Sequence, residues 1–132
     1  SSDVCSSDLW GEGLDVLLVD MPTGTGDIPL EYYTTMPFDC SLFVITPGEL
    51  SAESGLRAVN LAEMLRVPVM GVVENFACEE LAISDKFSEL PVAASLPYDP
   101  ALRVACDRGQ LEEFETDAFD YLARTIGEMI SR

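Results

Sequence analysis

The sequence has no histidine and a single lysine, Lys86, among its 132 residues. Without histidine, a Ser-His or Cys-His nucleophile system is excluded, and a self-contained zinc site loses its usual nitrogen ligand. The four cysteines are widely spaced and include no C-x-x-C pair, so a disulfide framework is not expected. No apolar run approaches the roughly 18 residues that cross a bilayer, and no secretory signal pattern opens the sequence. We therefore expect a cytoplasmic protein without integral membrane association.

Positive charge is also scarce, since 7 Lys and Arg residues face 24 Asp and Glu residues and the net charge is −17. Such a surface repels phosphate backbones, so nucleic-acid binding is not expected. A solvated surface is the simpler interpretation of the acidity, and an acidic docking face for a basic partner is the alternative. The length and the 48% of hydrophobic residues suit one packed domain.

Apolar runs and helical patterns alternate along the chain after residues 1–9, SSDVCSSDL, which we interpret as a non-native junction. Apolar runs predict buried strands at Leu14–Asp20, Ser41–Thr46, Val67–Glu74 and Val92–Leu96. Helices are predicted at Ile28–Met36, Ser51–Arg66 (with Ser51 and Ser54 as caps), Glu79–Leu90, Pro100–Arg108 and Leu111–Ile130. This alternation predicts an α/β fold with a mostly parallel sheet and helices on both faces.

Polar and turn residues follow each predicted strand. They are Asp20 with the GTGD turn, Thr46-Pro47, Glu74-Asn75, and Pro97-Tyr98-Asp99. Ligands of parallel α/β sheets bind beyond the carboxyl ends of the strands. We therefore expect the polar chemistry to lie along one edge of the sheet.

The stretch VLLVDMPTGTGDIPL, residues 16–30, places an aspartate at the end of an apolar run and a glycine-rich turn after it. Asp20 can hold Mg²⁺ through its water shell. Gly24 and Gly26 let the backbone approach a phosphate, and Thr25 adds a hydroxyl. Asp27 can orient water or, alternatively, cap the next helix.

Two residues further along have both a functional and a structural interpretation. Asn75 can contact an adenine edge or close the strand in an Asx-turn. Cys78 can be a metal ligand or a small, inert apolar residue.

The segment DVLLVDMPTGTGD resembles the strand and switch segment of Mrp/ApbC-type ATPases, which carry iron–sulfur clusters and belong to the MinD/ParA-like branch of P-loop NTPases. The resemblance continues in VITPGELSAESGLRAVNLAEMLRVPVMGVVENFA and in SLPYDPALRVACDRG. It implies a MinD-like P-loop NTPase fold that is incomplete at the N-terminus, with 10–132 as the C-terminal part of one domain. Thr23 stands where the family usually has a second proline.

The resemblance assigns roles residue by residue. Asp20 matches the Walker B aspartate that supports Mg²⁺, and residues 24–27 match the switch loop near the γ-phosphate, which makes Asp20 and Asp27 the catalytic candidates. Asn75 matches the adenine contact, and Pro97 with Tyr98 matches the segment that borders the base. The implied cofactors are ATP and Mg²⁺, and the implied partners are a second copy of the chain and apo iron–sulfur client proteins.

Two parts of the family pattern are absent from the sequence. The Walker A loop with its lysines would lie upstream, so this fragment is not expected to hydrolyse ATP alone. The cluster-binding C-x-x-C is replaced by one cysteine, Cys78, which would supply two ligands per dimer. The leading hypothesis is an Mrp-type iron–sulfur cluster carrier or assembly factor. The alternatives are a MinD/ParA-like nucleotide-gated dimerisation switch with a protein cargo and no cluster, and a nucleotide-free scaffold or gene remnant.

Overall fold

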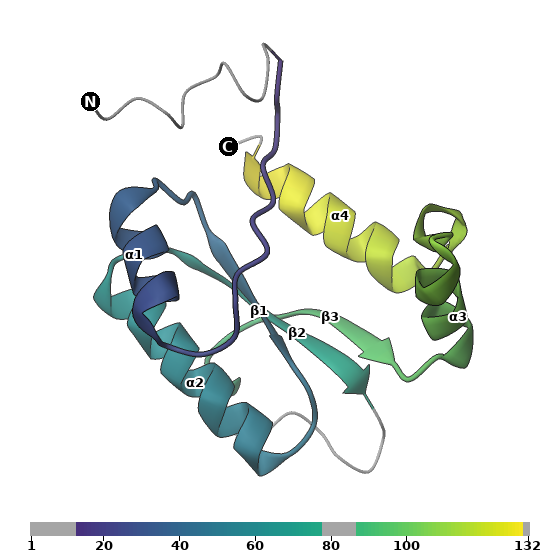
Figure 1. Ribbon diagram of the computed structural model, residues 1–132, viewed down its shortest axis with the longest axis horizontal. Helices are drawn as coiled ribbons and strands as arrows, with labels where there is room; N and C mark the ends of the chain where they lie inside the picture. Colours follow the sequence, from purple (N-terminus) through teal and green to yellow (C-terminus); the bar gives the residue numbers. More distant parts are fainter. Residues whose placement is uncertain (1–12, 78–86, 131–132) are drawn as a thin grey trace.

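The computed structural model describes residues 13–77 and 87–130, so the interpretation of residues 1–9 as a junction lies outside the described residues. Helices and strands alternate through its central part (Figure 1). In chain order the elements are α1 (Asp27–Thr35), β1 (Ser41–Ile45), α2 (Glu49–Met64), β2 (Val69–Ala77), β3 (Val92–Pro97), α3 (Pro100–Arg108), the 3-10 turn η2 (Leu111–Glu113) and α4 (Asp117–Ile130).

The three strands form a parallel sheet in the order β1-β2-β3. The central strand β2 is the most buried, and its residues Met70, Val72 and Val73 belong to the core. Parallel neighbours need a long crossover connection, which α2 supplies between β1 and β2. β2 begins at Val69 and not at the predicted Val67, after Pro68, which has no N–H to donate to a ladder. Because all three strands run in the same direction, they end at the same edge of the sheet.

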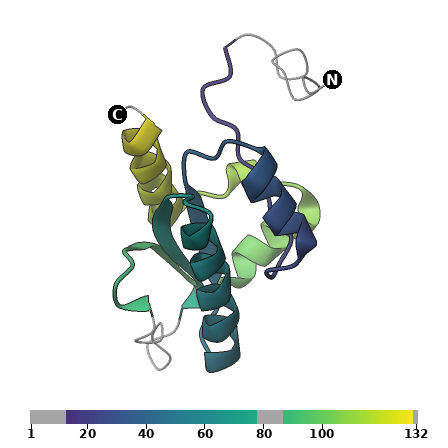
Figure 2. The same cartoon turned by 90° about the vertical axis from the view of Figure 1, so that its left-hand side faces the viewer.

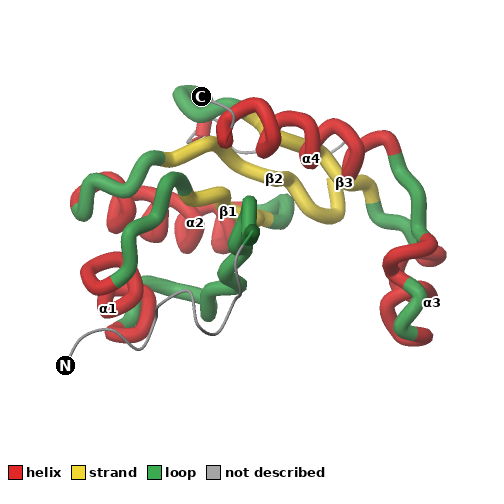
Figure 3. Tube along the Cα trace, turned by 90° about the horizontal axis from the view of Figure 1, so that it is seen from above, coloured by secondary structure: helices red, strands yellow, loops and turns green. Residues whose placement is uncertain are grey.

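Helices cover both faces of this sheet, as the sequence predicts. Figures 2 and 3 show α1 and α2 on one side and α4 on the other. The core on the α2 side is formed by Ile45, Ala52, Val59, Val72 and Phe87. The core on the α4 side is formed by Met70, Val73, Ala93 and Ala94, with the half-buried Leu122 and Ile126 of α4 packed against it. The sheet is thus the middle layer of three.

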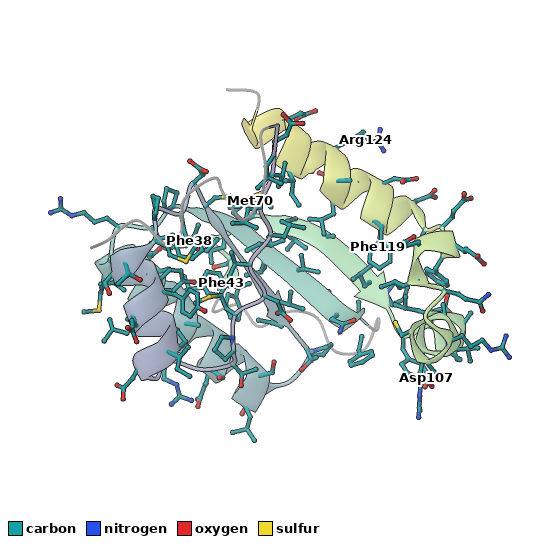
Figure 4. All side chains as sticks on the ribbon, turned by 45° about the horizontal axis from the view of Figure 1, so that its top comes forward. Phe38, Phe43, Met70, Asp107, Phe119 and Arg124 are labelled. Atoms are coloured by element: carbon teal, nitrogen blue, oxygen red, sulfur yellow. The ribbon has the colours of Figure 1, made fainter. Side chains whose placement is uncertain are left out.

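Charged side chains lie on the outer surfaces of the helices. Asp107 of α3 and Arg124 of α4 extend away from the sheet, whereas Phe43 and Met70 lie among the side chains packed on it (Figure 4). Arg103 and Asp107 approach within 4.0 Å one helical turn apart, with about three-quarters of each side chain exposed. Exposed pairs of this kind add little to stability. These charges fit the solvated-surface interpretation of the composition.

The sequence predicts α3 with its correct limits because both ends carry local signals. The Asp99 carboxylate accepts a 2.7 Å hydrogen bond from the Ala101 N–H, and Pro100 follows as the first helical residue. Gly109 ends the helix in the left-handed conformation, with φ of 66°. A short helix of this kind can be located from its caps alone.

The predicted buried strand at Leu14–Asp20 is wrong. Residues 13–20 are extended chain outside the sheet (Figure 1), and Leu14 and Leu18 are 50% and 77% exposed. A strand is held by ladder hydrogen bonds to a neighbour, and within the described residues β1, β2 and β3 pair only with one another. The apolar run therefore makes no ladder hydrogen bonds with the sheet.

The predicted helix at Leu111–Ile130 is two elements. The 3-10 turn η2 ends at Glu113, the backbone becomes extended at Phe114, and α4 starts only at Asp117. Phe114 and Phe119 meet edge to face across this break, with ring centroids 6.4 Å apart. The apolar residues that suggested one continuous helix therefore lie on both sides of a bend in the chain.

Two further helix predictions also need correction. Most of the predicted helix Glu79–Leu90 lies outside the described residues, and its described end is a turn closed by Leu90 N–H bonding to the Phe87 carbonyl oxygen at 2.9 Å. The hydroxyl of Ser51 does not cap α2. Its oxygen accepts from the Thr46 N–H at 3.0 Å and lies 3.0 Å from the Thr46 hydroxyl, so it ties the helix to the end of β1.

Within the described residues, no helix is long and apolar enough to span a membrane.

Candidate functional site

The carboxyl edge of the sheet brings together three of the four predicted clusters of polar residues. Thr46 follows β1, Asn75 lies near the end of β2, and Pro97 ends β3 (Figure 1). The strand ends lie at nearly the same level, since Ile45 pairs with Glu74 and the next residue of β2, Asn75, pairs with Leu96. Parallel topology alone accounts for this, because residues far apart in sequence reach one edge when their strands run the same way.

The GTGD turn is an open loop between the extended segment and α1. Asp20 is exposed, and so are Gly24, Thr25 and Gly26. Gly24 has φ of 95°, a conformation that favours glycine. A Cβ atom added at Gly24 or Gly26 would meet no other atom within 4 Å. The backbone of this turn is thus uncovered and free to approach a ligand.

Asp27 is the first residue of α1 and not its cap. Gly26 occupies the N-cap position, and no side chain caps the helix there. The alternative interpretation of Asp27 as an N-cap is therefore wrong, and its exposed carboxylate stands in the first helical turn.

The side chain of Asn75 is partly engaged with its own backbone. Its Oδ1 accepts a 3.1 Å hydrogen bond from the Phe76 N–H. This bond reaches only the next residue, whereas an Asx-turn would accept from the N–H two residues on, so the predicted Asx-turn is not formed. The bond leaves the amide NH₂ group as the part of Asn75 available to a ligand. Among the described residues no acceptor for that NH₂ group is found.

Glu74 is a site feature that the motif analysis assigned no role. Its side chain is 8% exposed, and its Oε2 accepts a 3.1 Å hydrogen bond from the Ser95 hydroxyl on the neighbouring strand. Its Oε1 is buried and has no hydrogen-bond partner in the described part of the chain. An acidic residue inside an apolar strand run was the available sequence signal, because a buried carboxylate is costly unless it is paired.

The described residues contain no cluster of three or more Cys, Asp or Glu side chains able to hold a metal ion. Cys78 lies outside them, so its predicted role in cluster binding stays a prediction. Cys40 and Cys106 are free thiols. Burial, and secondarily the charge of Asp39, raises the pKa of the Cys40 thiol.

The sheet and its two helical layers define a three-layered α/β architecture, in which ligands bind beyond the carboxyl ends of the parallel strands. A solved structure described as the nucleotide-binding protein in complex with ADP from Archaeoglobus fulgidus matches this chain with a TM-score of 0.69 and 35% identity. The match covers 86% of this chain and 52% of that one.

The curated relatives that match this chain are also longer than it is. An iron–sulfur cluster carrier protein of Helicobacter pylori is 37% identical over 77% of this chain and 32% of its own length. One from Methanococcus maripaludis is 38% identical over 93% and 49%. A cytosolic Fe-S cluster assembly factor NUBP1 homolog of Caenorhabditis elegans is 34% identical over 93% and 45%. The chain therefore spans less than half the length of these curated relatives.

The profile of a ParA family described as NUBPL iron-transfer P-loop NTPase matches residues 2–130. The chain belongs to this family of P-loop NTPases, whose curated members named above are iron–sulfur cluster carriers and assembly factors. This membership confirms the resemblance that the sequence motifs indicated.

Proposed function

We propose that this chain is the C-terminal part of an ATP-binding and ATP-hydrolysing iron–sulfur cluster carrier or assembly factor of the Mrp type. The observation that carries the proposal is the uncovered GTGD turn, which begins four residues after Asp20 in a chain of this family. An exposed carboxylate followed by open backbone is what a Mg²⁺–phosphate group requires.

The phosphate side of the site is assigned to the turn. Asp20 would hold Mg²⁺ through water, and the backbone of Gly24, Thr25 and Gly26 would face the γ-phosphate. Asp27 would orient the attacking water from the first turn of α1. Mg²⁺ would supply charge neutralisation on the phosphate oxygens. The open space around Gly24 and Gly26 supports this assignment, because a side chain there would separate backbone from phosphate.

The base side of the site is assigned to the ends of β2 and β3. The free NH₂ group of Asn75 would donate to a ring nitrogen of adenine, since Oδ1 is engaged with the Phe76 N–H. Pro97 and the 60% exposed Tyr98 would border the base.

The upstream part of the protein would complete the sheet and the phosphate site. The segment Leu14–Asp20 is apolar, extended and unpaired within the described chain, and Val44 on the edge strand β1 is 65% exposed. A further strand that lies beside β1 in the sheet and carries a glycine- and lysine-rich loop would bury both this segment and Val44. We therefore assign residues 10–132 to the C-terminal part of one domain whose ATPase activity requires that loop.

In the complete protein, two chains closed over nucleotide would couple hydrolysis to the release of a cluster to apo client proteins in the cytoplasm. The absence of C-x-x-C from the sequence favours a second candidate, a MinD/ParA-like switch with a protein cargo and no cluster. A nucleotide-free scaffold is the third candidate, and it predicts no ATP affinity even with the native upstream sequence present.

ATP hydrolysis by the complete polypeptide tests the assignment of these residues to a nucleotide site. Asp20→Asn is expected to lower Mg²⁺-dependent ATP hydrolysis roughly 10–100-fold. The matched control is Asp15→Asn, the same change at an exposed position five residues upstream, which should leave the rate unchanged. Equal rates for Asp20→Asn and the wild type would contradict the role of Asp20.

Iron content separates the two nucleotide-dependent candidates. After anaerobic reconstitution, a carrier should retain iron that Cys78→Ser removes, whereas a switch should retain none in either form. Light scattering of the same samples with and without ATP tests the dimer.

A further inference from the structure

An exposed aromatic pair stands beside Asn75 at the carboxyl edge of the sheet. The rings of Phe76 and Tyr98 have centroids 5.8 Å apart and an interplanar angle of 50°. Their contact does not bury them, since Phe76 is 51% exposed and Tyr98 is 60% exposed. Two large rings therefore present free faces to solvent at the edge where the proposed function places the base.

The backbone holds Phe76 in this position at a conformational cost. Phe76 has φ of 61°, in the left-handed region that a bulky residue rarely adopts. The pairing of β2 with β3 also shifts register between Asn75 and Ala77, so Phe76 is the bulged residue. Bulges re-aim side chains beside functional sites, and strained backbone persists where the surrounding structure maintains it.

The local hydrogen bond stabilises this bulge and orients the adjacent amide. The Asn75 Oδ1 accepts from the N–H of Phe76, the residue with the left-handed φ. The same contact engages Oδ1 and leaves the Asn75 NH₂ group as the donor next to this aromatic pair. A flat ring with an acceptor nitrogen on its edge matches both features.

We infer that Phe76 is a further base-binding residue, which stacks together with Tyr98 against the purine base of the bound nucleotide. This inference rests on the proposed function and adds a residue to it. Base–aromatic stacking contributes about 1–3 kcal/mol per base, which corresponds to roughly 5- to 150-fold in affinity.

The test is titration of the complete polypeptide with ADP and, separately, with pyrophosphate. Phe76→Gly is expected to weaken ADP binding roughly 5- to 150-fold and to leave pyrophosphate binding unchanged. Because glycine adopts a φ of 61° without strain, the same variant should not lower the thermal unfolding midpoint. A change that weakens binding without destabilising the fold is not expected of a merely structural residue.

Two control variants define the alternatives. Phe76→Tyr keeps an aromatic face and should bind ADP as the wild type does. Tyr121→Ala removes an aromatic side chain of similar exposure, 55%, from α4 and should also bind normally. Equal loss of ADP and pyrophosphate affinity in Phe76→Gly, or loss of neither, would overturn the stacking role while leaving nucleotide binding intact. A wild type that binds neither ligand would overturn the proposed function and this inference with it.

Discussion

Replacing Gly55 with alanine should destabilise the protein, although alanine is the better helix former. Gly55 lies within α2, where that helix crosses β1. A Cβ atom built on Gly55 would lie 2.7 Å from Cγ2 of Ile45 and 3.1 Å from Cζ of Phe87. Ordinary contacts between carbon atoms are about 3.5–4.0 Å, so the helix or the strand must move. Both neighbours are buried core residues, and Ile45 is stiff at χ1.

Two opposing contributions decide whether Gly55→Ala raises or lowers the free energy of unfolding. Gly→Ala in a helix interior gains about 1 kcal/mol from propensity, whereas inserting a methyl group into a packed core costs about 1–3 kcal/mol. Because the new methyl group meets two core side chains at once, we expect the upper part of that range. The net result should be a loss of about 1–2 kcal/mol in the free energy of unfolding.

Gly127 of α4 provides a matched control for this substitution. A Cβ atom added there would meet nothing within 4 Å. Gly127→Ala should therefore raise the free energy of unfolding by about 0.5–1 kcal/mol. Urea titration of the two variants and the wild type gives both values. A Gly55→Ala variant as stable as the wild type would refute the close packing of α2 on β1.

Two further predictions concern the surroundings of Glu74 and Cys40. Ser95→Ala should lower the free energy of unfolding by about 1–3 kcal/mol, because it leaves both oxygens of the buried Glu74 carboxyl group without a hydrogen-bond partner in the described part of the chain. Urea titration measures this loss, and unchanged stability would contradict the hydrogen bond between Ser95 and Glu74. At pH 8, the partly buried Cys40 should react with iodoacetamide more slowly than the exposed Cys106, since desolvation and the charge of Asp39 raise the pKa of Cys40 and lower its thiolate fraction. Peptide mass spectrometry measures both rates, and equal rates would contradict this difference in surroundings.

Local signals predicted the elements whose limits depend on a few neighbouring residues. The capping aspartate, the following proline and the terminal glycine located α3, and short apolar runs located β1 and β3 to within a residue. The break before α4 was also encoded locally, because Thr116-Asp117 is a typical helix start, but the apolar pattern across the bend outweighed it. The family followed from motifs in the correct order, and the profile match confirmed it.

The sequence by itself determined the alternation of strands and helices, the helix limits that carry caps, and the family. Only the tertiary structure decided the surroundings of each side chain. An apolar run such as Leu14–Asp20 becomes a strand only where a neighbouring edge offers ladder hydrogen bonds, and the burial of Glu74 depends on strands that pair across long sequence separations. The exposure of Phe76 likewise follows from a bulge between β2 and β3. Such pairings join residues that are far apart in the sequence, so no short stretch of sequence contains both partners.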